Sequence, residues 1–168
     1  MYSVNPSSDD LRLAHLVSKA VALTGVRLIR VDVACNIDPR TFQGKLNTSF
    51  ECDGDKYQLE DRRLSTFVNF KLEIKAEDCS VAYSANLLYS VDFLTPAGSV
   101  PDEIRDKGFP AFARVNGPYL CWPYIREELS SLTVRAGLPA LVLPTMVIDP
   151  KPNTSPEGET APEECPAK

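Results

Sequence analysis

The sequence predicts an α+β fold: a four-stranded antiparallel sheet followed by a long C-terminal helix, with an extra helix at the N-terminus. Two patterns lead to this prediction. Four successive segments alternate apolar and polar residues with a period of two, and no helical pattern separates them. Apolar residues then recur at helical spacing from Trp122 to Ala136. Because consecutive strands without intervening helices form an antiparallel sheet, we expect one apolar sheet face that the helices cover.

The first element is predicted as a helix that starts at Asp10, a typical N-cap residue, and stops at Gly25. Its apolar residues recur at helical spacing and share one face: Leu13, Leu16, Val17, Ala20 and Val21. The only histidine, His15, lies beside this stripe, where a histidine is more often a boundary residue than a catalyst. Residues 1–8 are expected to form a flexible N-terminus.

The four strands are predicted at residues 29–38, 45–52, 64–76 and 81–93, each with apolar side chains on one face. Residues 77–80 form the polar connection of a hairpin between the last two strands. The first strand is expected to present these side chains to the core: Ile29, Val31, Val33, Cys35 and Ile37. The last two present a longer series: Leu64, Thr66, Val68, Phe70, Leu72, Ile74, then Val81, Tyr83, Ala85, Leu87, Tyr89, Val91 and Phe93.

The long helix is predicted to begin at residues 116–118, where Pro118 would stand near the first helical position, and to end at Gly137. Pro123 is expected to kink or restart it. Apolar residues line one face: Trp122, Ile125, Leu129, Leu132 and Ala136. Tyr119, Leu120 and Tyr124 lie partly outside this stripe. Because a helix with more than one apolar face must be covered on each, we expect an oligomer built through sheet edges and this helix.

Length and composition limit the domain organisation and the partners. The chain has 168 residues and a formal net charge of −5, and one domain is expected over residues 9–149. Residues 150–168 are rich in proline and glutamate and lack aliphatic core residues, so a disordered tail is expected. The negative charge argues against nucleic-acid binding, and no apolar stretch approaches the ~20 residues of a membrane helix. Without a signal-peptide pattern, the expected location is the cytoplasm.

No catalytic or metal-binding pattern stands out, so we predict a protein that is not an enzyme and uses neither cofactor nor metal. The cysteines are scattered without a CxxC pair, and a single histidine cannot complete a zinc site with them. They are expected to be buried or idle thiols in a reducing compartment. Glu127 and Glu128 are adjacent on the predicted helix, so they point to different faces and make a poor acid–base pair.

Two sequence blocks nevertheless match a known pattern. The first contains Pro123, Tyr124, Arg126 and Glu127 at the long helix. The second continues from the helix into the segment after it: Ser131, Leu132, Arg135, Pro139, Leu141, Leu143 and Asp149. Together they resemble the corresponding segment of the SecB protein-export chaperone family, whose order of four strands and then a helix also fits this chain.

The resemblance implies an ATP-independent holdase that forms dimers of dimers and binds unfolded clients in apolar grooves. As hypotheses, the residues that face the client include Phe42, Leu120, Trp122 and Tyr124. Those at the oligomer interface are Ile125, Arg126, Glu127, Leu129 and Leu132. Two alternatives stay open, namely that Trp122 and Ile125 are core residues and that Tyr124 belongs to the oligomer interface. A further alternative is an adaptor that binds one folded partner through the same surface.

The departures from the family favour a dedicated SecB-like chaperone of the kind that accompanies toxin–antitoxin pairs. The housekeeping protein has an acidic stretch on its first strand for the translocase motor SecA. Residues 34–39 here read ACNIDP, which argues against that docking. The predicted N-terminal helix resembles an extension found in SecB-like chaperones that bind an antitoxin's aggregation-prone tail. Whether the client is a preprotein or an antitoxin stays open.

Overall fold

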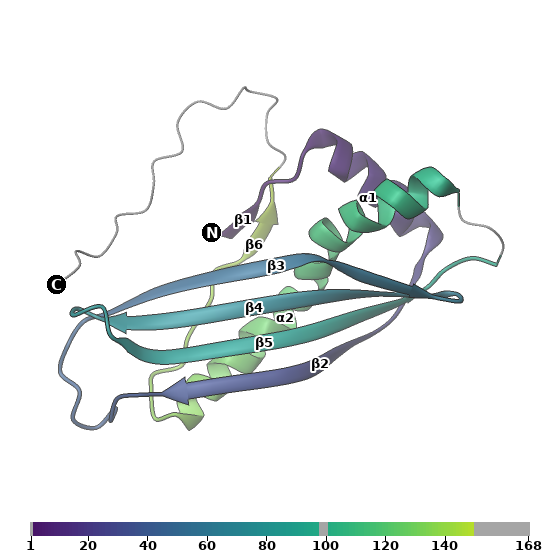
Figure 1. The fold of residues 1–168 in the computed structure, drawn as a ribbon. Coiled ribbons are helices and arrows are strands. Elements are labelled where there is room, and N and C mark those ends of the chain that lie inside the picture. Colours follow the sequence, from purple (N-terminus) through teal and green to yellow (C-terminus); the bar gives the residue numbers. More distant parts are fainter. Residues whose placement is uncertain (1, 98–100, 150–168) are drawn as a thin grey trace.

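The computed structural model describes residues 2–97 and 101–149 of the chain. Its elements follow in the order shown in Figure 1: β1 (Tyr2–Val4), α1 (Ser8–Ala20), β2 (Ala22–Cys35), β3 (Leu46–Glu60), β4 (Arg63–Ala76), β5 (Val81–Leu94), the π-helical turn η1 (Ile104–Gly108), α2 (Phe109–Arg135) and β6 (Met146–Ile148). The expected disordered tail at residues 150–168 lies outside the described residues. The predicted fold class is confirmed, since an N-terminal helix, a four-stranded antiparallel sheet and a long helix follow one another.

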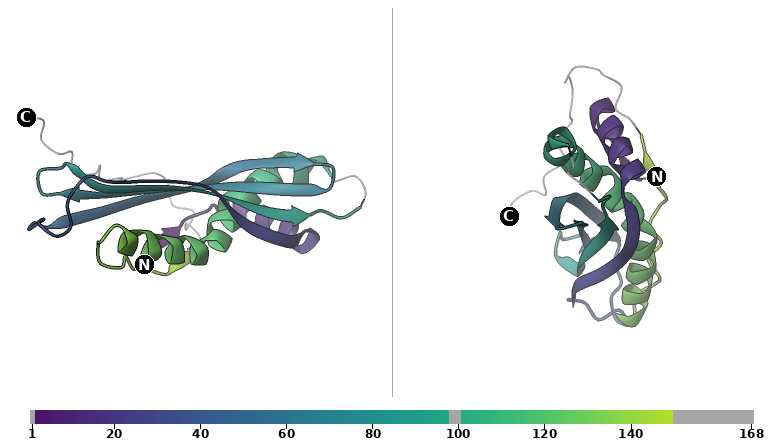
Figure 2. Two further views of the ribbon diagram at one scale, coloured as in Figure 1. Left: turned by 90° about the horizontal axis from the view of Figure 1, so that it is seen from below. Right: turned by 90° about the vertical axis from the view of Figure 1, so that its right-hand side faces the viewer.

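The sheet has the strand order β2-β5-β4-β3, and every neighbouring pair is antiparallel. β4 and β5 are therefore central, whereas β2 and β3 are the two edges. Helix α2 crosses one face of the sheet diagonally, with α1 beside its first half (Figures 1 and 2). We call this face the inner face and the opposite one the outer face.

The two central strands supply about half of the core, on the faces that the alternation predicted. All six predicted residues of β4, from Leu64 to Ile74, are buried. On β5 the series from Tyr83 to Phe93 is buried, and only Val81 at the strand end is half-buried. α2 covers these side chains with aromatic contacts, such as an edge-on contact between Phe93 and Phe112, whose ring centroids are 4.9 Å apart. Pairing on both sides and a helix above bury every second side chain of both strands.

Helix α1 begins and ends earlier than predicted. Its N-cap is Ser7, whose Oγ accepts a hydrogen bond from the backbone N–H of Asp10 at 3.1 Å. Asp10 instead lies in the first turn, where its carboxylate accepts a 2.6 Å hydrogen bond from Arg114 of α2. The predicted stop at Gly25 is wrong, because the helix ends at Ala20 and Gly25 lies inside β2. Val17 is fully buried, while Leu16 of the predicted stripe is 41% exposed.

Helix α2 also begins earlier than predicted, at Phe109 instead of residues 116–118. Proline does stand near the first helical position, but it is Pro110, and Pro118 and Pro123 are both inside the helix. Buried Phe109, Phe112 and Val115 continue the apolar face toward the N-terminus, which explains the additional turns. The end is as predicted: Gly137 has φ +79°, the left-handed conformation that terminates helices. The segment after it runs back along α2 toward β6.

A second, two-stranded sheet joins the two ends of the described chain. β1 pairs in parallel with β6, and Ser3 is opposite Val147. Trp122 and Thr133 hold the segment before β6 against α2. The Trp122 indole N–H donates to the carbonyl of Pro144 at 2.9 Å, and the Thr133 hydroxyl accepts from the backbone N–H of Leu141 at 3.0 Å. Residues 2–4, which the sequence placed in a flexible N-terminus, thus form a strand.

Candidate interaction surfaces

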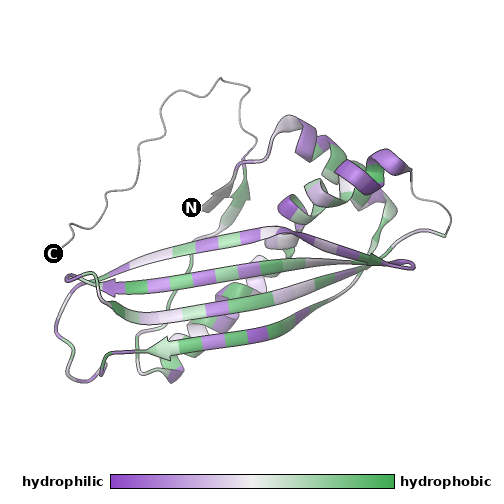
Figure 3. Ribbon diagram, in the orientation of Figure 1, coloured by the Kyte–Doolittle hydropathy of each residue, from purple (hydrophilic) through white to green (hydrophobic). Residues whose placement is uncertain are grey.

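Edge strand β2 carries an apolar surface that the rest of the chain leaves uncovered. We define the β2 apolar strip as its large aliphatic side chains that are more than a third exposed: Leu23, Leu28, Ile29, Val31 and Val33. Figure 3 shows apolar and polar bands alternating along β2 at the edge of the sheet. The prediction that this strand buries one apolar face is wrong, because no residue of β2 is buried. Single exposed aliphatic residues are ordinary, but five on one edge strand form a candidate interaction surface.

The residues expected to face a client lie in different environments. Tyr124 is 49% exposed on α2, whereas Leu120 is half-buried against the core. Phe42 is half-buried in the loop between β2 and β3, with its ring folded toward Gly44 of the same loop. Tyr119, which the sequence placed outside the apolar stripe of the helix, is 51% exposed. Tyr119 and Tyr124 are therefore aromatic side chains of α2 that a partner can reach without any rearrangement.

Trp122 is a core residue in this chain. It is 4% exposed and packs against both Phe50 of β3 and Phe70 of β4, at centroid distances of 5.9 Å and 6.0 Å. Its indole N–H is used within the chain, by the hydrogen bond to Pro144. Of the two hypotheses for Trp122, core packing therefore describes its position. A client would reach the Trp122 side chain only after local opening of the structure.

The expected oligomer residues on α2 are also divided by burial. Ile125 and Leu129 are fully buried against the chain's own sheet. Arg126 and Leu132 are half-buried, and Glu127 is exposed. The apolar stripe of the helix therefore packs within the chain, which leaves its polar flank and the exposed Val134 for other contacts.

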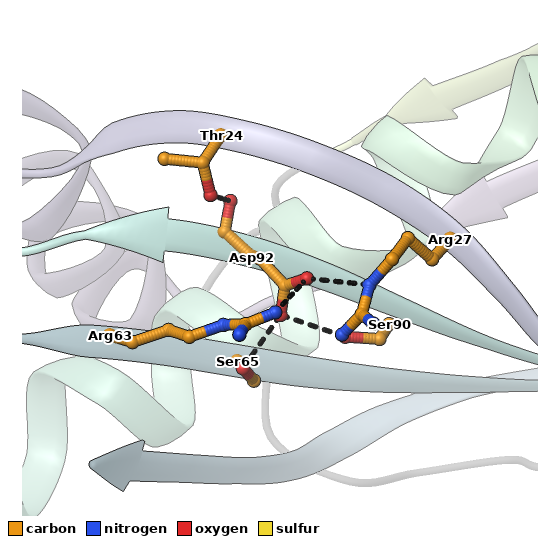
Figure 4. Close-up of polar contacts among 6 residues, drawn as sticks. All are labelled: Thr24, Arg27, Arg63, Ser65, Ser90 and Asp92. Carbon is orange, nitrogen blue, oxygen red and sulfur yellow. Dashed lines mark hydrogen bonds and ion pairs between the residues drawn. The ribbon is translucent and has the colours of Figure 1, made fainter.

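A charged cluster lies at one end of the sheet, on its outer face (Figure 4). Its centre is Asp92 of β5, a carboxylate that is 3% exposed. Arg27 of β2 donates to Oδ2 at 3.0 Å and Arg63 of β4 donates to the same oxygen at 2.8 Å. The hydroxyls of Ser65 and Ser90 donate to Oδ1 at 2.7 Å and 2.9 Å. The cluster therefore joins three strands through one side chain.

The hydrogen bonds decide the charge of Asp92. Burial by itself raises the pKa of the carboxyl, but the hydrogen bonds from Arg63, Ser65, Ser90 and Arg27 outweigh it and hold the pKa well below its usual range. The sequence reasoning missed this cluster, because its members are far apart in the chain. The one available signal was an aspartate within an otherwise apolar strand, preceded by Ser90.

The described residues contain no group of three or more potential metal ligands. Cys35, Cys52 and Cys121 are free, and burial raises the pKa of Cys52 and of Cys121 to about 12, which makes both thiols poor nucleophiles. The expectation of idle thiols is wrong for Cys79, which is disulfide-bonded. Cys165 lies outside the described residues. In the described part of the chain, no helix has the length and apolar character required to cross a membrane.

Comparison with known proteins connects this architecture to a chaperone. No family model and no curated protein matches the sequence. Among solved structures, the chain is similar to the Mycobacterium tuberculosis SecB-like chaperone Rv1957, solved in complex with a ChAD peptide from the Rv1956 HigA1 antitoxin. The TM-score is 0.71 at 22% identity, over 82% of this chain and 98% of that one. The chain has a SecB-like fold.

The similarity covers nearly the whole of the Mycobacterium tuberculosis protein. A protein of unknown function from Streptococcus agalactiae is also similar, at 8% identity over 74% of this chain and 97% of that one. Its TM-score is 0.37, too low to support any argument. The resemblance seen in the sequence is thus confirmed at the level of the fold.

Proposed function

We propose that this protein is an ATP-independent holdase of the SecB type that binds an aggregation-prone polypeptide, with an antitoxin as its client. The observation that carries the proposal is the SecB-like fold, shared with a chaperone that was solved with an antitoxin peptide. The exposed apolar side chains of β2 and α2 support it, because an unfolded client offers apolar segments that need such a surface.

The proposed mechanism is binding alone. A holdase lowers the concentration of free, aggregation-prone chain by binding the unfolded state, and this shift by mass action needs no nucleotide, metal or catalytic residue. The net charge of −5 helps to keep a protein with exposed apolar side chains in solution, in keeping with action in the cytoplasm.

We assign the client to the exposed aromatic side chains of α2, Tyr119 and Tyr124. Leu120 of the same helix and Phe42 of the loop after β2 are half-buried, and they would contribute if the client displaces their neighbours. Aromatic side chains suit the task, because they bury large areas without demanding a particular client sequence. Export duty is the less supported role, since residues 34–39 lack the acidic stretch associated with SecA.

We assign self-assembly to the β2 edge. An exposed edge strand presents unpaired backbone N–H and C=O groups, and a second copy can pair with it in antiparallel fashion. The partner copy would then cover the β2 apolar strip, so that this strip would serve self-assembly and not client binding. Pairing of two such dimers through α2 would produce the dimer of dimers that the resemblance implies.

Aggregation assays test the holdase function. An aggregation-prone protein is diluted from denaturant into an excess of this chain without nucleotide, and light scattering is followed. We expect suppression for several unrelated clients, and weaker suppression by a Tyr119→Ser, Tyr124→Ser double variant. Arg135→Gln, an exposed change in the last turn of α2, is the matched control and should suppress like the unaltered protein. Unchanged scattering at all ratios and for all clients would contradict the proposal.

The same assay distinguishes a general holdase from an adaptor that binds one folded partner. Suppression restricted to one partner, together with binding of that partner in its folded state, would favour the adaptor. An unfolded preprotein and an antitoxin with an exposed apolar tail are then compared for protection from a protease. Stronger protection of the antitoxin is expected, and the opposite order would favour the export role.

A further inference from the structure

Edge strand β2 is not a regular strand. Its pairing with β5 contains two irregularities, between Leu23 and Gly25 and between Leu28 and Arg30. Between these two points Val26 is opposite Val91, Arg27 is opposite Ser90 and Leu28 is opposite Tyr89. Beyond the second point the pairing is regular, from Arg30 opposite Leu88 to Cys35 opposite Tyr83. Each β-bulge inserts one extra residue and so reverses the faces of all residues beyond it.

The bulges determine which side chains of β2 lie on the inner face. Val91 and Tyr89 are inner-face residues of β5, so their partners Val26 and Leu28 share that face. Ser90 is an outer-face residue, which places Arg27 on the outer side beside Asp92. All the large aliphatic residues of β2 that have a partner on β5 therefore face inward, although they do not alternate evenly in the sequence: Leu23, Val26, Leu28, Val31 and Val33.

Without the second bulge, the residues of β2 before Arg30 would exchange the inner and outer faces of the sheet. Extending the regular pairing back from Arg30 places Ile29 opposite Tyr89 and Arg27 opposite Val91, which is fully buried. The guanidinium would then be on the apolar face, without its carboxylate, while Val26 would be opposite Asp92. Placing a charge against an apolar face without a partner is strongly unfavourable. Arg27 is therefore the residue that discriminates between the two registers.

We propose that Asp92 is a positioning residue that fixes the register of edge strand β2 by holding Arg27 on the outer face. Three contacts act on the same short stretch: Arg27 binds the Asp92 carboxylate, the hydroxyl of Thr24 donates to the Asp92 carbonyl at 2.9 Å, and Gly25 is opposite Asp92. The proposal rests on the assignment of self-assembly to β2, because the register decides which side chains form the β2 apolar strip.

The two arginines provide a matched test, because each donates to the same oxygen of Asp92 from a different strand. Both side chains are more than half exposed, so we expect each alanine variant to fold. Arg27→Ala removes the contact from β2, whereas Arg63→Ala removes an equivalent contact from β4. The full chain is measured by NMR, with backbone amide exchange in β2 and cross-strand contacts between β2 and β5 as readouts.

In Arg27→Ala we expect amide exchange in β2 about tenfold faster, with β3 and β4 unchanged. We also expect the contact of Leu28 with Tyr89 to give way to one of Ile29 with Tyr89. Arg63→Ala should keep the Leu28 contact and the slow exchange of β2, and Arg27→Lys should restore them in part. Retention of the Leu28 contact in Arg27→Ala, or an equal loss in both alanine variants, would overturn the proposal. None of these readouts depends on holdase activity, so the proposed function can fail separately.

Discussion

The two edges of the sheet, β2 and β3, are built in opposite ways. The inner face of β3 is covered by α2: Tyr57 contacts Phe109 with ring centroids 6.0 Å apart, and Phe50 packs on Trp122. The outer face of β3 is charged, with Glu51, Asp53 and Lys56 among its side chains. β2, in contrast, has no buried residue and exposes five large aliphatic side chains.

One edge strand of this sheet is therefore protected, and the other is exposed. Charges and a bulge between Asp53 and Lys56 make β3 a poor template for another strand, as protected edges are. β2 has bulges too, but they direct its aliphatic side chains to the inner face, where the chain supplies too little cover. An exposed apolar edge is an aggregation hazard unless a partner covers it. We therefore assign the proposed contact with a second copy of the chain to the β2 edge.

The largest expected effect on stability concerns Trp122, which covers the inner face of β3. Trp122→Ala should lower the free energy of unfolding by about 3–5 kcal/mol, because it leaves a cavity beside Phe50 and Phe70 and an unpaired carbonyl at Pro144. Ile29→Ala, on the exposed edge, should change it by only about 0.5 kcal/mol. Denaturant unfolding measures both. Equal effects would mean that the two edges are covered alike, contrary to the comparison.

The second prediction concerns the contact that joins β2 to the central strands. Asp92→Asn should destabilise by about 1.5–3 kcal/mol at pH 7, since it removes charged hydrogen bonds. The pKa of Asp92 is depressed in the folded state, so the unfolded chain binds its proton first as the pH falls. The stabilisation is therefore present above about pH 4 and declines below it. Unfolding of both proteins from pH 7 to pH 2.5 should show their difference shrinking, and a constant difference would refute this.

Alanine substitution of one glycine on each edge strand compares how tightly the two edges are packed. A Cβ at Gly54 of β3 would lie 2.6 Å from Cδ of Pro118 and 3.0 Å from the carbonyl of Ala113, so Gly54→Ala should cost about 1–3 kcal/mol. A Cβ at Gly25 of β2 would meet nothing within 4 Å, and Gly25→Ala should be neutral or stabilise by up to about 1 kcal/mol. Thermal unfolding distinguishes them. A larger loss at Gly25 would show that the β2 edge is more tightly packed than its exposure indicates.

The smallest effect on stability, and the clearest on assembly, is expected for Ile29→Lys. Ile29 is 50% exposed and lies at the second bulge without a partner on β5, so the change should alter the stability of the single chain by only about 0.5 kcal/mol. It introduces a charge into the proposed contact between copies, so light scattering of the purified protein should report a lower mass. Gln58→Lys on β3 is the control and should leave the mass unchanged. A monomeric unaltered protein would remove the assignment of assembly to β2.

Sequence patterns were most informative where burial follows from a strand's own neighbours. β4 and β5 are paired on both sides, so every side chain that their alternation predicted for the inner face is buried except Val81, although the buried Ser90 and Asp92 on the outer face were not predicted. The alternation of β2 was equally clear, but its apolar side chains were wrongly predicted to be buried. The burial of an edge strand depends on whether α2 lies over it. The start of α2 was missed because Pro110, Pro118 and Pro123 each fit a helix start locally, and only packing selects among them.

The sequence by itself determined the order of the two helices and the four long strands, the inner faces of the two central strands and the end of α2 at Gly137. These features depend on hydrophobic periodicity and on backbone preferences that act within a few residues. Tertiary structure decided which edge is covered, the placement of Trp122 in the core and the convergence of Arg27, Arg63 and Asp92. The physical reason is that burial and charge pairing depend on groups far apart in the chain, whose proximity no local pattern encodes.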